Sequence, residues 1–310
     1  MDRGMQQQAD TKSSATLILG CGYIGTALAH DLAAQGKRVV AVKRDVSQQP
    51  FVHPNVAWRQ GDVTQAQGLP WEEGPYTDVV YSVSSSHGDS LAYEKAYVQG
   101  LQSVMPHLKP LPSLRRFVYL SSTGVYGQNE GQWVDESMPI DPPGKNPQLL
   151  VQAENLVLEA SQRWGIPGVV LRLSGIYGPD RCHALQRLLS GMVQLELPGD
   201  RWVNMIHQQD VVRAILATFI HGPAGSVFNV SDDCPVAQKE LYEWIASEVG
   251  CPSPQWVHAG ALKKNKRQVT HKRVSNQKIK SVLGVRLKYP TYREGYAALV
   301  KANRPLDSQI

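Results

Sequence analysis

Short apolar runs rich in β-branched residues alternate along the chain with longer stretches in which apolar residues recur every three or four positions. The short runs predict seven strands, at residues 16–19, 38–42, 56–59, 78–83, 116–120, 168–173 and 226–230. The stretches between them have helical spacing, as Ile24, Leu28 and Leu32 illustrate. Strands separated by helices form a parallel sheet that is covered on both faces. The pattern therefore predicts an α/β fold with a doubly wound parallel sheet.

The regular alternation ends near residue 174. Beyond that point, helical stretches at 211–219 and 238–249 are broken by glycine and proline, and a basic segment precedes a last tyrosine-rich stretch. We expect a disordered tail at residues 1–14, the main sheet domain at 15–174 and a smaller lobe at 175–310. A strand at about 226–230 should return from this lobe to the sheet.

The charge of the chain narrows the choice of partners. The 32 Lys and Arg against 27 Asp and Glu give a formal net charge of +5, which suits an anionic small molecule better than a nucleic acid. Part of the surplus lies in one basic run, comprising Lys263, Lys264, Lys266, Arg267, Lys272 and Arg273. We interpret this run as a solvated loop, because most charge runs are solvated.

The remaining composition indicates the compartment. The start of the chain lacks the apolar core of a signal peptide, and no apolar run reaches about 18 residues. The four cysteines have neither the spacing of a zinc site nor that of a disulfide framework. We therefore expect a cytoplasmic protein with no metal site and no contact with membrane or nucleic acid.

A Gly-x-Gly-x-x-Gly pattern follows the first predicted strand and opens a helical stretch. The loop comprises Gly20, Cys21, Gly22, Tyr23, Ile24 and Gly25. Gly20 allows the tight turn, Gly22 lets a pyrophosphate approach the backbone, and Gly25 lets the helix pack close to the strand. The positive end of the helix then faces the phosphates. This arrangement predicts a Rossmann domain that binds a nicotinamide dinucleotide.

Residues after the next three strands bear on which dinucleotide binds. NAD enzymes carry an acid after the second strand, whereas Lys43 and Arg44 stand there in this chain. A charge-assisted contact from Arg44 favours a 2′-phosphate and hence NADP, while an inward turn of Asp45 would leave NAD as the alternative. Asp62 can accept a hydrogen bond from the adenine amino group or serve as a turn residue. Ser84 follows the fourth strand, which borders the cofactor in this fold.

Four further segments, taken in order, resemble the extended short-chain dehydrogenase/reductase superfamily, which contains nucleotide-sugar epimerases and dehydratases. Residues 117–127 look like the strand that carries the active-site serine, with Ser122 at its position. Residues 170–179, 203–211 and 228–230 are similar to the strand entering the substrate lobe, to the following helix entry and to a last strand. The resemblance implies an NAD(P)-binding domain, a substrate-binding lobe and an oxidoreductase or epimerase activity. It leaves a homodimer as an open alternative.

The chain departs from this family at the residues that transfer the proton. Active members carry a Tyr-x-x-x-Lys pair followed four residues later by a glutamate. If Glu154 matches that glutamate, Asn146 and Leu150 occupy the other two positions, and neither side chain can titrate. Dehydratases of the family also carry Asp-Glu after the serine, where this chain has Thr123 and Gly124, which argues against a sugar-nucleotide dehydratase. The chain thus resembles an atypical member that keeps the glycine loop and the serine.

Several side chains remain that can act on a substrate. The hydroxyls of Ser122 and Thr123 either polarise a substrate carbonyl or only satisfy strand-end backbone groups. Candidates for the proton donor are Tyr126, His87, Lys145 and His207. Candidates for binding an anionic group are Arg201, which we favour, and Arg172 and Arg273. His87 is also a candidate contact for substrate, and His207 either contacts substrate or caps the helix that begins near Gln208.

Two functions from different classes remain open. The first is an NADP-linked oxidoreductase or epimerase acting on a small carbonyl or sugar-nucleotide-like substrate, whose reacting oxygen Ser122 orients. The second is a sensor or partner-binding protein that kept the dinucleotide site after losing the proton-transfer pair. A nucleotide-sugar binder that oxidises and re-reduces a tightly held cofactor is a variant of the first, and it predicts that the cofactor copurifies.

Overall fold

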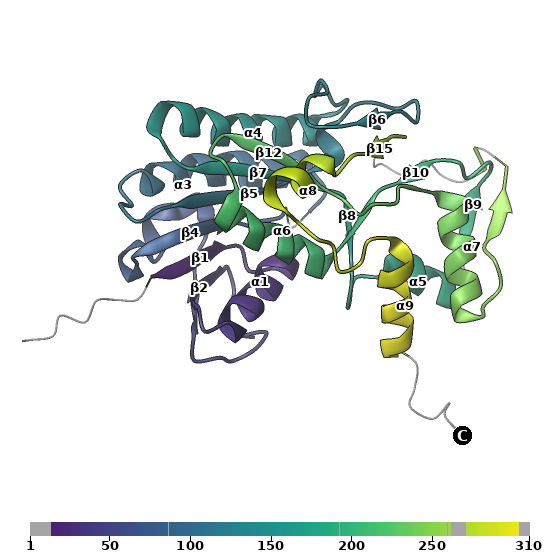
Figure 1. Ribbon diagram of the computed structural model, residues 1–310, viewed down its shortest axis with the longest axis horizontal. Coiled ribbons are helices and arrows are strands. Elements are labelled where there is room, and N and C mark those ends of the chain that lie inside the picture. Colours follow the sequence, from purple (N-terminus) through teal and green to yellow (C-terminus); the bar gives the residue numbers. More distant parts are fainter. Residues whose placement is uncertain (1–13, 86, 192, 259, 262–270, 304–310) are drawn as a thin grey trace, which may run out of the picture.

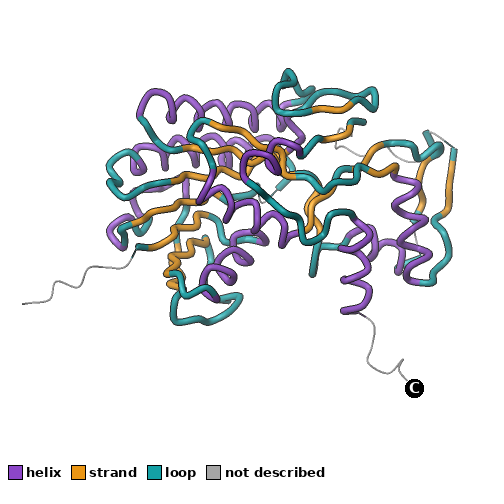
Figure 2. Tube along the Cα trace, in the orientation of Figure 1, coloured by secondary structure: helices purple, strands orange, loops and turns teal. Residues whose placement is uncertain are grey.

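The computed structural model describes residues 14–303 with the exception of 86, 192, 259 and 262–270. All but the last residue of the tail expected at 1–14 fall outside the described residues, as do Lys263, Lys264, Lys266 and Arg267 of the basic run. Figure 1 shows one twisted sheet flanked by helices and a smaller group of helices and short strands beside it. Figure 2 shows the strands of the sheet side by side between the two groups of helices.

Seven parallel strands form the central sheet, in the order β12-β7-β5-β4-β1-β2-β3. Their bounds are β1 (Ala15–Leu19), β2 (Arg38–Lys43), β3 (Val56–Gln60), β4 (Tyr76–Tyr81), β5 (Arg116–Ser122), β7 (Gly168–Leu173) and β12 (Ser226–Val230). All seven predicted strands are present, which confirms the doubly wound α/β class. The strand order reverses between β1 and β4, and a crevice opens at such a point outside the carboxyl ends of the strands.

Helices cover both faces of this sheet (Figure 1). One face carries α3 (Gly100–Leu108) and α4 (Lys145–Trp164), and the other carries α1 (Tyr23–Ala34), α6 (Gln208–His221) and α8 (Gln277–Leu283). Successive strand residues point to opposite faces, so Leu17 and Leu19 pack with the first group while Ile18 packs with the second. Double coverage explains why the strands are apolar at nearly every position.

Short elements connect the strands on the first face. They are η1 (Val63–Gly68), η2 (Trp71–Glu73), α2 (Ser90–Tyr93), η3 (Glu94–Gln99) and η4 (Thr123–Val125). Of these, η4 follows β5 directly, and α2 continues into η3 and α3 without a break. The region directly after β5 is therefore a tight turn, which matters for the position of Ser122.

A smaller lobe with its own core lies beside the sheet (Figure 1). Its elements are α5 (His183–Leu189), β9 (Gln194–Glu196), β10 (Trp202–Val203), β13 (Val236–Ala237), α7 (Gln238–Val249), β14 (Gln255–Val257) and α9 (Tyr292–Asn303). Leu188, Leu241 and Tyr296 pack in its core. Two parallel strand pairs join the lobe to the sheet domain, namely β8 (Gly175–Tyr177) with β11 (Met205–His207), and β6 (Trp133–Val134) with β15 (Arg273–Val274). In the part of the chain that is described, no helix combines the length and apolar character needed to cross a membrane.

The described end of the basic run is not a solvated loop, and that prediction is wrong for Lys272 and Arg273. Lys272 is only 3% exposed, and its Nζ donates a hydrogen bond to the Tyr126 carbonyl oxygen at 3.0 Å. The Arg273 guanidinium lies 5.2 Å from the ring of Trp133 and 5.1 Å from that of Trp202. A planar cation stacks on aromatic faces, and the pairing of β15 with β6 carries both residues back against the protein.

Candidate functional site

The glycine loop forms the turn between β1 and α1. Gly20 has φ of 89°, and a Cβ there would lie 2.7 Å from the backbone of Val83 in the loop after β4. A Cβ on Gly25 would lie 2.7 Å from the Gly20 carbonyl oxygen. A Cβ on Gly22, in contrast, would meet nothing within 4 Å. Protein contacts therefore require Gly20 and Gly25, whereas Gly22 leaves open space in front of α1.

This open space fits the diphosphate of a dinucleotide. No side chain caps the start of α1, and its first turn contains no acid. The first N–H groups of a helix carry partial positive charge, and they bind phosphate oxygens where nothing else satisfies them. Cys21 lies inside the loop, and burial raises the pKa of its thiol to about 12, so Cys21 is no nucleophile. Ile24 is buried and anchors the helix to the core.

Tyr23 ties the glycine loop to the smaller lobe. Its hydroxyl donates to the Pro179 carbonyl oxygen at 2.7 Å, and its own carbonyl oxygen accepts a hydrogen bond from Gln208 Nε2 at 3.0 Å. The guanidinium of Arg181 lies 5.4 Å from the centre of its ring. The loop that would hold the diphosphate is thus fixed against the loop that precedes α5.

The residues expected at the adenosine end line up along the carboxyl edge of β2 and β3. Arg44 is exposed, and the Lys43 ammonium lies 6.0 Å from the centre of the Trp58 ring. The Asp45 carboxylate turns back into its own loop, where Oδ1 accepts the Ser47 N–H at 2.8 Å. Asp62 Oδ1 accepts hydrogen bonds from the N–H and the hydroxyl of Thr64, so Asp62 also begins η1 as a turn residue. The cations are therefore the groups left to meet a ligand.

Ser122 lies at the carboxyl end of β5, next to the crevice. Its Oγ accepts the N–H of Gly124 at 3.1 Å and so begins η4. A hydroxyl that accepts one hydrogen bond still has its proton to donate. Thr123 follows and is 9% exposed. Ser122 therefore stabilises the turn and can still donate to a substrate oxygen.

A buried polar network lies behind this strand end. Arg172, on β7, forms a two-point ion pair with Glu154 of α4, with Nη2 and Oε2 2.8 Å apart. Ser121 donates to the same carboxylate at 2.6 Å. Arg172 Nη1 also donates to the hydroxyl of Tyr126, which donates in turn to Asn229 Oδ1, both at 2.8 Å. The network connects α4, β5, β7 and β12 beneath Ser122.

Tyr126 and Lys272 belong to this interior. Tyr126 is fully buried, its hydroxyl has two protein partners, and burial raises its pKa. A proton donor has to come within hydrogen-bond reach of the substrate, and no surface of this side chain is open to one. Burial lowers the pKa of Lys272 to about 8, and its ammonium holds the Tyr126 carbonyl from behind. Both residues position the turn after Ser122.

The helix α4 presents Asn146, Leu150 and Glu154 one turn apart on one side. Leu150 is 6% exposed and packs with Tyr126 and Val134. Leu150 therefore contributes an apolar contact and no charge, at a position close to the turn after Ser122.

Ser84 and His87 lie in the loop between β4 and α2, and both are exposed. The loop starts next to the glycine loop, where the N–H of Ser82 donates to the Leu19 carbonyl oxygen at 2.8 Å. It ends at Asp89, whose Oδ1 caps α2 by accepting the N–H of Ala92 at 2.8 Å. The loop thus connects the region of the glycine loop with the start of α2.

His207 lies at the junction of the two lobes. It is 2% exposed, its ring centre is 3.9 Å from that of Tyr289, and its Nδ1 accepts the N–H of Gln209 at 3.2 Å. The side chain therefore caps α6, as one of the two sequence interpretations proposed. Burial, with a smaller contribution from the Lys288 ammonium, lowers the pKa of His207 to about 4.

This depressed pKa predicts a loss of stability in acid. Because the unfolded histidine titrates near 6.5, the unfolded chain binds a proton between pH 6.5 and about 4 that the folded chain does not. The contribution to the free energy of unfolding is complete above pH 6.5 and is lost as the pH falls toward 4. Urea titrations over this range should show a steeper loss for the wild type than for His207→Asn, which keeps a capping oxygen. If the free energy of unfolding depended on pH in the same way in both proteins, the lowered pKa of His207 would be contradicted.

Arg201 lies in the smaller lobe just before β10. Among the described residues, none forms a hydrogen bond or ion pair with its half-buried guanidinium. The nearby Tyr242 hydroxyl accepts a hydrogen bond from Arg187 Nη1 at 3.3 Å, and Tyr242 also acts electrostatically on Arg201. Two guanidinium groups that have no acid partner in the described part of the chain therefore lie near one phenol, and such groups suit an anion.

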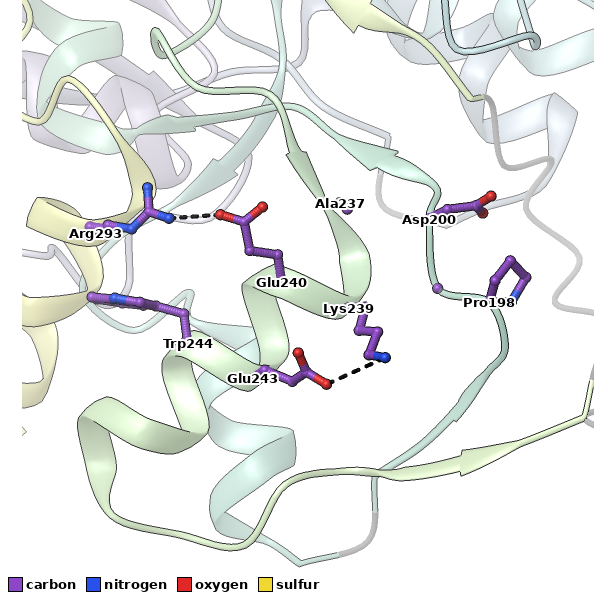
Figure 3. Close-up of a pocket in the computed structure, with 9 residues that line it drawn as sticks. Pro198, Asp200, Ala237, Lys239, Glu240, Glu243, Trp244 and Arg293 are labelled. Carbon is purple, nitrogen blue, oxygen red and sulfur yellow. Dashed lines mark hydrogen bonds and ion pairs between the residues drawn. The ribbon is translucent and has the colours of Figure 1, made fainter.

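The lobe also contains an open cavity of about 530 Å³. Figure 3 shows that its side chains come from the start of α7, from α9 and from the loop before β10. Arg293 pairs with Glu240 at 2.7 Å, and Lys239 with Glu243 at 3.9 Å, so most of its charges are already neutralised. The cavity includes none of the residues expected to bind cofactor or substrate, and we do not assign it to the site.

Sequence reasoning missed several residues of the site. Asn146 was considered only as a replacement for a tyrosine, yet its side chain holds the loop that carries His87. Lys272 was taken for a surface cation, and Arg187 was not considered. Arg172 was named as a candidate for binding an anion, but its guanidinium is paired with the buried Glu154 carboxylate. A charged residue inside an apolar strand run implies such a buried partner. No local pattern marks the other three.

Comparison with known proteins gives the family. The sequence pattern described as the NAD dependent epimerase/dehydratase family matches residues 16–231. Protein YeeZ of Escherichia coli K12 is 25% identical over 290 residues, covering 88% of this chain and 95% of that protein. A functionally unknown conserved protein from Silicibacter pomeroyi is similar in structure, with a TM-score of 0.76, 30% identity and coverage of 94% of this chain and 99% of that one.

Further relatives have described activities. The dTDP-glucose 4,6-dehydratase of Streptomyces griseus is 26% identical over 213 residues, covering 64% of this chain and 63% of that enzyme. A UDP-glucose 4-epimerase with UDP-glucose from Thermotoga maritima has a TM-score of 0.82 at 19% identity, covers 93% of this chain and 97% of that one, and shares the fold. The resemblance to extended short-chain dehydrogenases is confirmed. The chain belongs to the NAD-dependent epimerase/dehydratase family.

Proposed function

We propose that the protein is an NADP-linked oxidoreductase or epimerase that acts on a sugar-nucleotide-like substrate. The observation that carries this proposal is the uncapped start of α1 behind Gly22, at the same sheet edge as the Ser122 hydroxyl. A site with a diphosphate cradle and a hydroxyl donor side by side suits the transfer of a hydride to or from a carbonyl carbon. When bound, the nicotinamide ring supplies the hydride acceptor or donor.

The charges after β2 favour NADP over NAD. Arg44 is exposed and can bind a 2′-phosphate, while the Asp45 carboxylate is engaged with the N–H of Ser47. NAD enzymes use an acid at this place to accept hydrogen bonds from the ribose hydroxyls. Here the Asp45 carboxylate accepts the Ser47 N–H instead. Solved structures of similar fold contain NAD. NAD is therefore the alternative cofactor, and a binding measurement has to compare its affinity with that of NADP.

The chemistry after β5 favours redox or epimerisation over dehydration. The Ser122 hydroxyl donates to the substrate oxygen and stabilises the charge that develops on it. Thr123 and Gly124, which follow, cannot protonate a leaving hydroxyl, as elimination of water requires. We therefore propose that this chain differs in reaction from the dehydratases among its relatives.

An anionic, sugar-nucleotide-like substrate is supported by two observations. Relatives include dTDP-glucose 4,6-dehydratases, and structures of similar fold contain UDP-glucose or UDP-glucuronic acid. In this chain, Arg201 and Arg187 lie near Tyr242 without an acid partner among the described residues, which suits a diphosphate. The rival sensor function is not favoured by these comparisons.

The experiment that tests this function follows hydride transfer to the bound cofactor. Protein loaded with NADP⁺ is mixed with UDP-glucose or dTDP-glucose, and the absorbance of reduced nicotinamide is recorded. We expect reduced cofactor to appear with at least one sugar nucleotide, and Ser122→Ala to slow its formation by about 10²–10³-fold. Ser281→Ala, an exposed serine on α8, serves as the matched control. Tight NADP⁺ binding with no reduction, unchanged by Ser122→Ala, would instead support the sensor.

A further inference from the structure

The segment after β4, described at residues 82–85 and 87–89, connects the glycine loop with α4. At its start, the N–H of Ser82 donates to the Leu19 carbonyl oxygen, and Val83 lies against Gly20 so closely that no Cβ fits between them. At its end, Asn146 of α4 holds the residues on either side of Asp89. Asn146 Nδ2 donates to the Gly88 carbonyl oxygen at 2.8 Å, and its Oδ1 accepts the Ser90 hydroxyl at 2.7 Å.

His87 lies in this loop, one residue before the clamp. Because β4 and β5 are neighbouring parallel strands, the loop after β4 passes next to the end of β5, where Ser122 lies. His87 is exposed, and the segment that carries it connects the glycine loop on one side with α4 on the other. We propose that His87 is the catalytic group that exchanges a proton with the substrate oxygen, held in place by the Asn146 clamp. This inference rests on the proposed function.

Three other titratable side chains already form hydrogen bonds within the protein. The Tyr126 hydroxyl is buried between Arg172 and Asn229, and the His207 imidazole caps α6 beside Tyr289. Lys272 donates to the Tyr126 carbonyl oxygen inside the protein. Of the residues that the sequence offered as proton donors, only His87 and Lys145 are exposed in the structure. Imidazole titrates near neutral pH and an ammonium does not, which favours His87.

The charged groups around His87 suit this role. Asp89 follows it in the same loop, and Lys145 stands beside Asn146 at the start of α4. The N–H of Ala92 lowers the pKa of Asp89 most, and the charge of His87 contributes to the same shift. The two side chains therefore interact electrostatically, so a carboxylate lies near the imidazole to which we assign the proton exchange.

The reaction moves one proton and one hydride, and each has an acceptor when a dinucleotide is bound. In the oxidation of a substrate alcohol, the O–H bond breaks and its proton passes to an imidazole nitrogen of His87. The C–H electron pair leaves as hydride to the oxidised nicotinamide, and the C–O bond becomes a carbonyl. In the reverse direction, His87 returns the proton to the oxygen. Ser122 donates a hydrogen bond to that oxygen in both directions.

The test measures whether a bound nicotinamide covers His87. The full-length protein is treated with diethyl pyrocarbonate, and the label on each histidine is quantified by mass spectrometry without ligand, with NADP⁺, and with 2′-phospho-ADP-ribose, which lacks the nicotinamide. We expect NADP⁺ to slow labelling of His87 severalfold and the truncated ligand to slow it less. The exposed His221, at the end of α6, is the internal reference and should label equally in all three samples.

Variants separate a catalytic from a structural role. His87→Gln should keep its NADP⁺ affinity and stability, lose about 10²-fold or more in turnover with UDP-glucose or dTDP-glucose, and lose a limb of the pH–rate profile. His221→Gln should change none of these. Asn146→Ala should weaken the protection of His87 by NADP⁺, because the loop is released from α4.

Each failure has a distinct meaning. If calorimetry finds no NADP⁺ uptake, the proposed function and this inference fall together. If NADP⁺ binds but leaves the labelling of His87 unchanged, or if His87→Gln retains full turnover, the role of His87 alone is overturned. Loss of turnover in Lys145→Gln but not in His87→Gln would assign the proton transfer to Lys145 instead.

Discussion

Glu154→Ala is expected to lower the free energy of unfolding by about 3–5 kcal/mol, because it leaves a buried charge without its partner. The Arg172 side chain is 4% exposed and that of Glu154 is fully buried, so solvent cannot replace the lost carboxylate. The Ser121 hydroxyl loses its acceptor as well. Chemical denaturation monitored by circular dichroism measures this difference.

Two controls show whether burial is the cause. Glu73→Ala removes the carboxylate from the ion pair with Arg59, whose side chains are 29% and 45% exposed, and should cost at most about 1 kcal/mol. The double variant Glu154→Leu/Arg172→Leu should recover part of the loss, because neither charge remains buried alone. Recovery stays incomplete since the Tyr126 hydroxyl loses its donor. A loss in Glu154→Ala no greater than that in Glu73→Ala would contradict this view of the network.

Gly22→Ala is expected to cost dinucleotide affinity without costing stability. A Cβ at this position meets no protein atom within 4 Å, so the free energy of unfolding should stay within about 0.5 kcal/mol of the wild type. The methyl group would occupy the space through which a diphosphate approaches the backbone, and we expect NADP⁺ affinity to fall by about tenfold or more, equivalent to at least about 1.4 kcal/mol. Calorimetric titration and urea unfolding measure the two effects.

Gly25→Ala is the matched contrast. Its Cβ would lie 2.7 Å from the Gly20 carbonyl oxygen, which forces α1 away from β1 and should cost about 1–3 kcal/mol of stability even without ligand. If Gly22→Ala bound NADP⁺ as tightly as the wild type, the open space in front of α1 would not be the diphosphate site.

The sheet and the glycine loop could be predicted because their signals are local. Each strand is an apolar run whose two faces are both covered, as Leu17, Ile18 and Leu19 show by packing into two different clusters. The conformation of the turn after β1 is fixed by glycine at Gly20 and Gly25, where a side chain would clash. The fold class therefore followed from patterns a few residues long.

The polar interior of the site could not be predicted because its partners are distant in the sequence. Lys272 meets Tyr126 across 146 positions, and Tyr126 meets Asn229 across 103. No local spacing marks such contacts, and a lysine in a basic run has the pattern of a solvated residue. Asn146 likewise could be interpreted only as a missing tyrosine until its two hydrogen bonds to the loop at Gly88 and Ser90 were seen.

The sequence leaves two roles for His207, and the structure shows one of them. A histidine before an aspartate-bearing helix start suits a helix cap, and a ligand contact is the alternative in sequence. The structure buries its ring beside Tyr289 and uses its Nδ1 for the N–H of Gln209. A substrate role would require this cap to break.

Isothermal titration calorimetry of the wild-type protein with NADP⁺ and NAD⁺ is the most direct measurement of whether the turn after β1 binds a dinucleotide. We expect one equivalent to bind per chain, NADP⁺ more tightly than NAD⁺ because of Arg44, and both more weakly in Gly22→Ala. Uptake of neither dinucleotide by folded protein would contradict the proposed function.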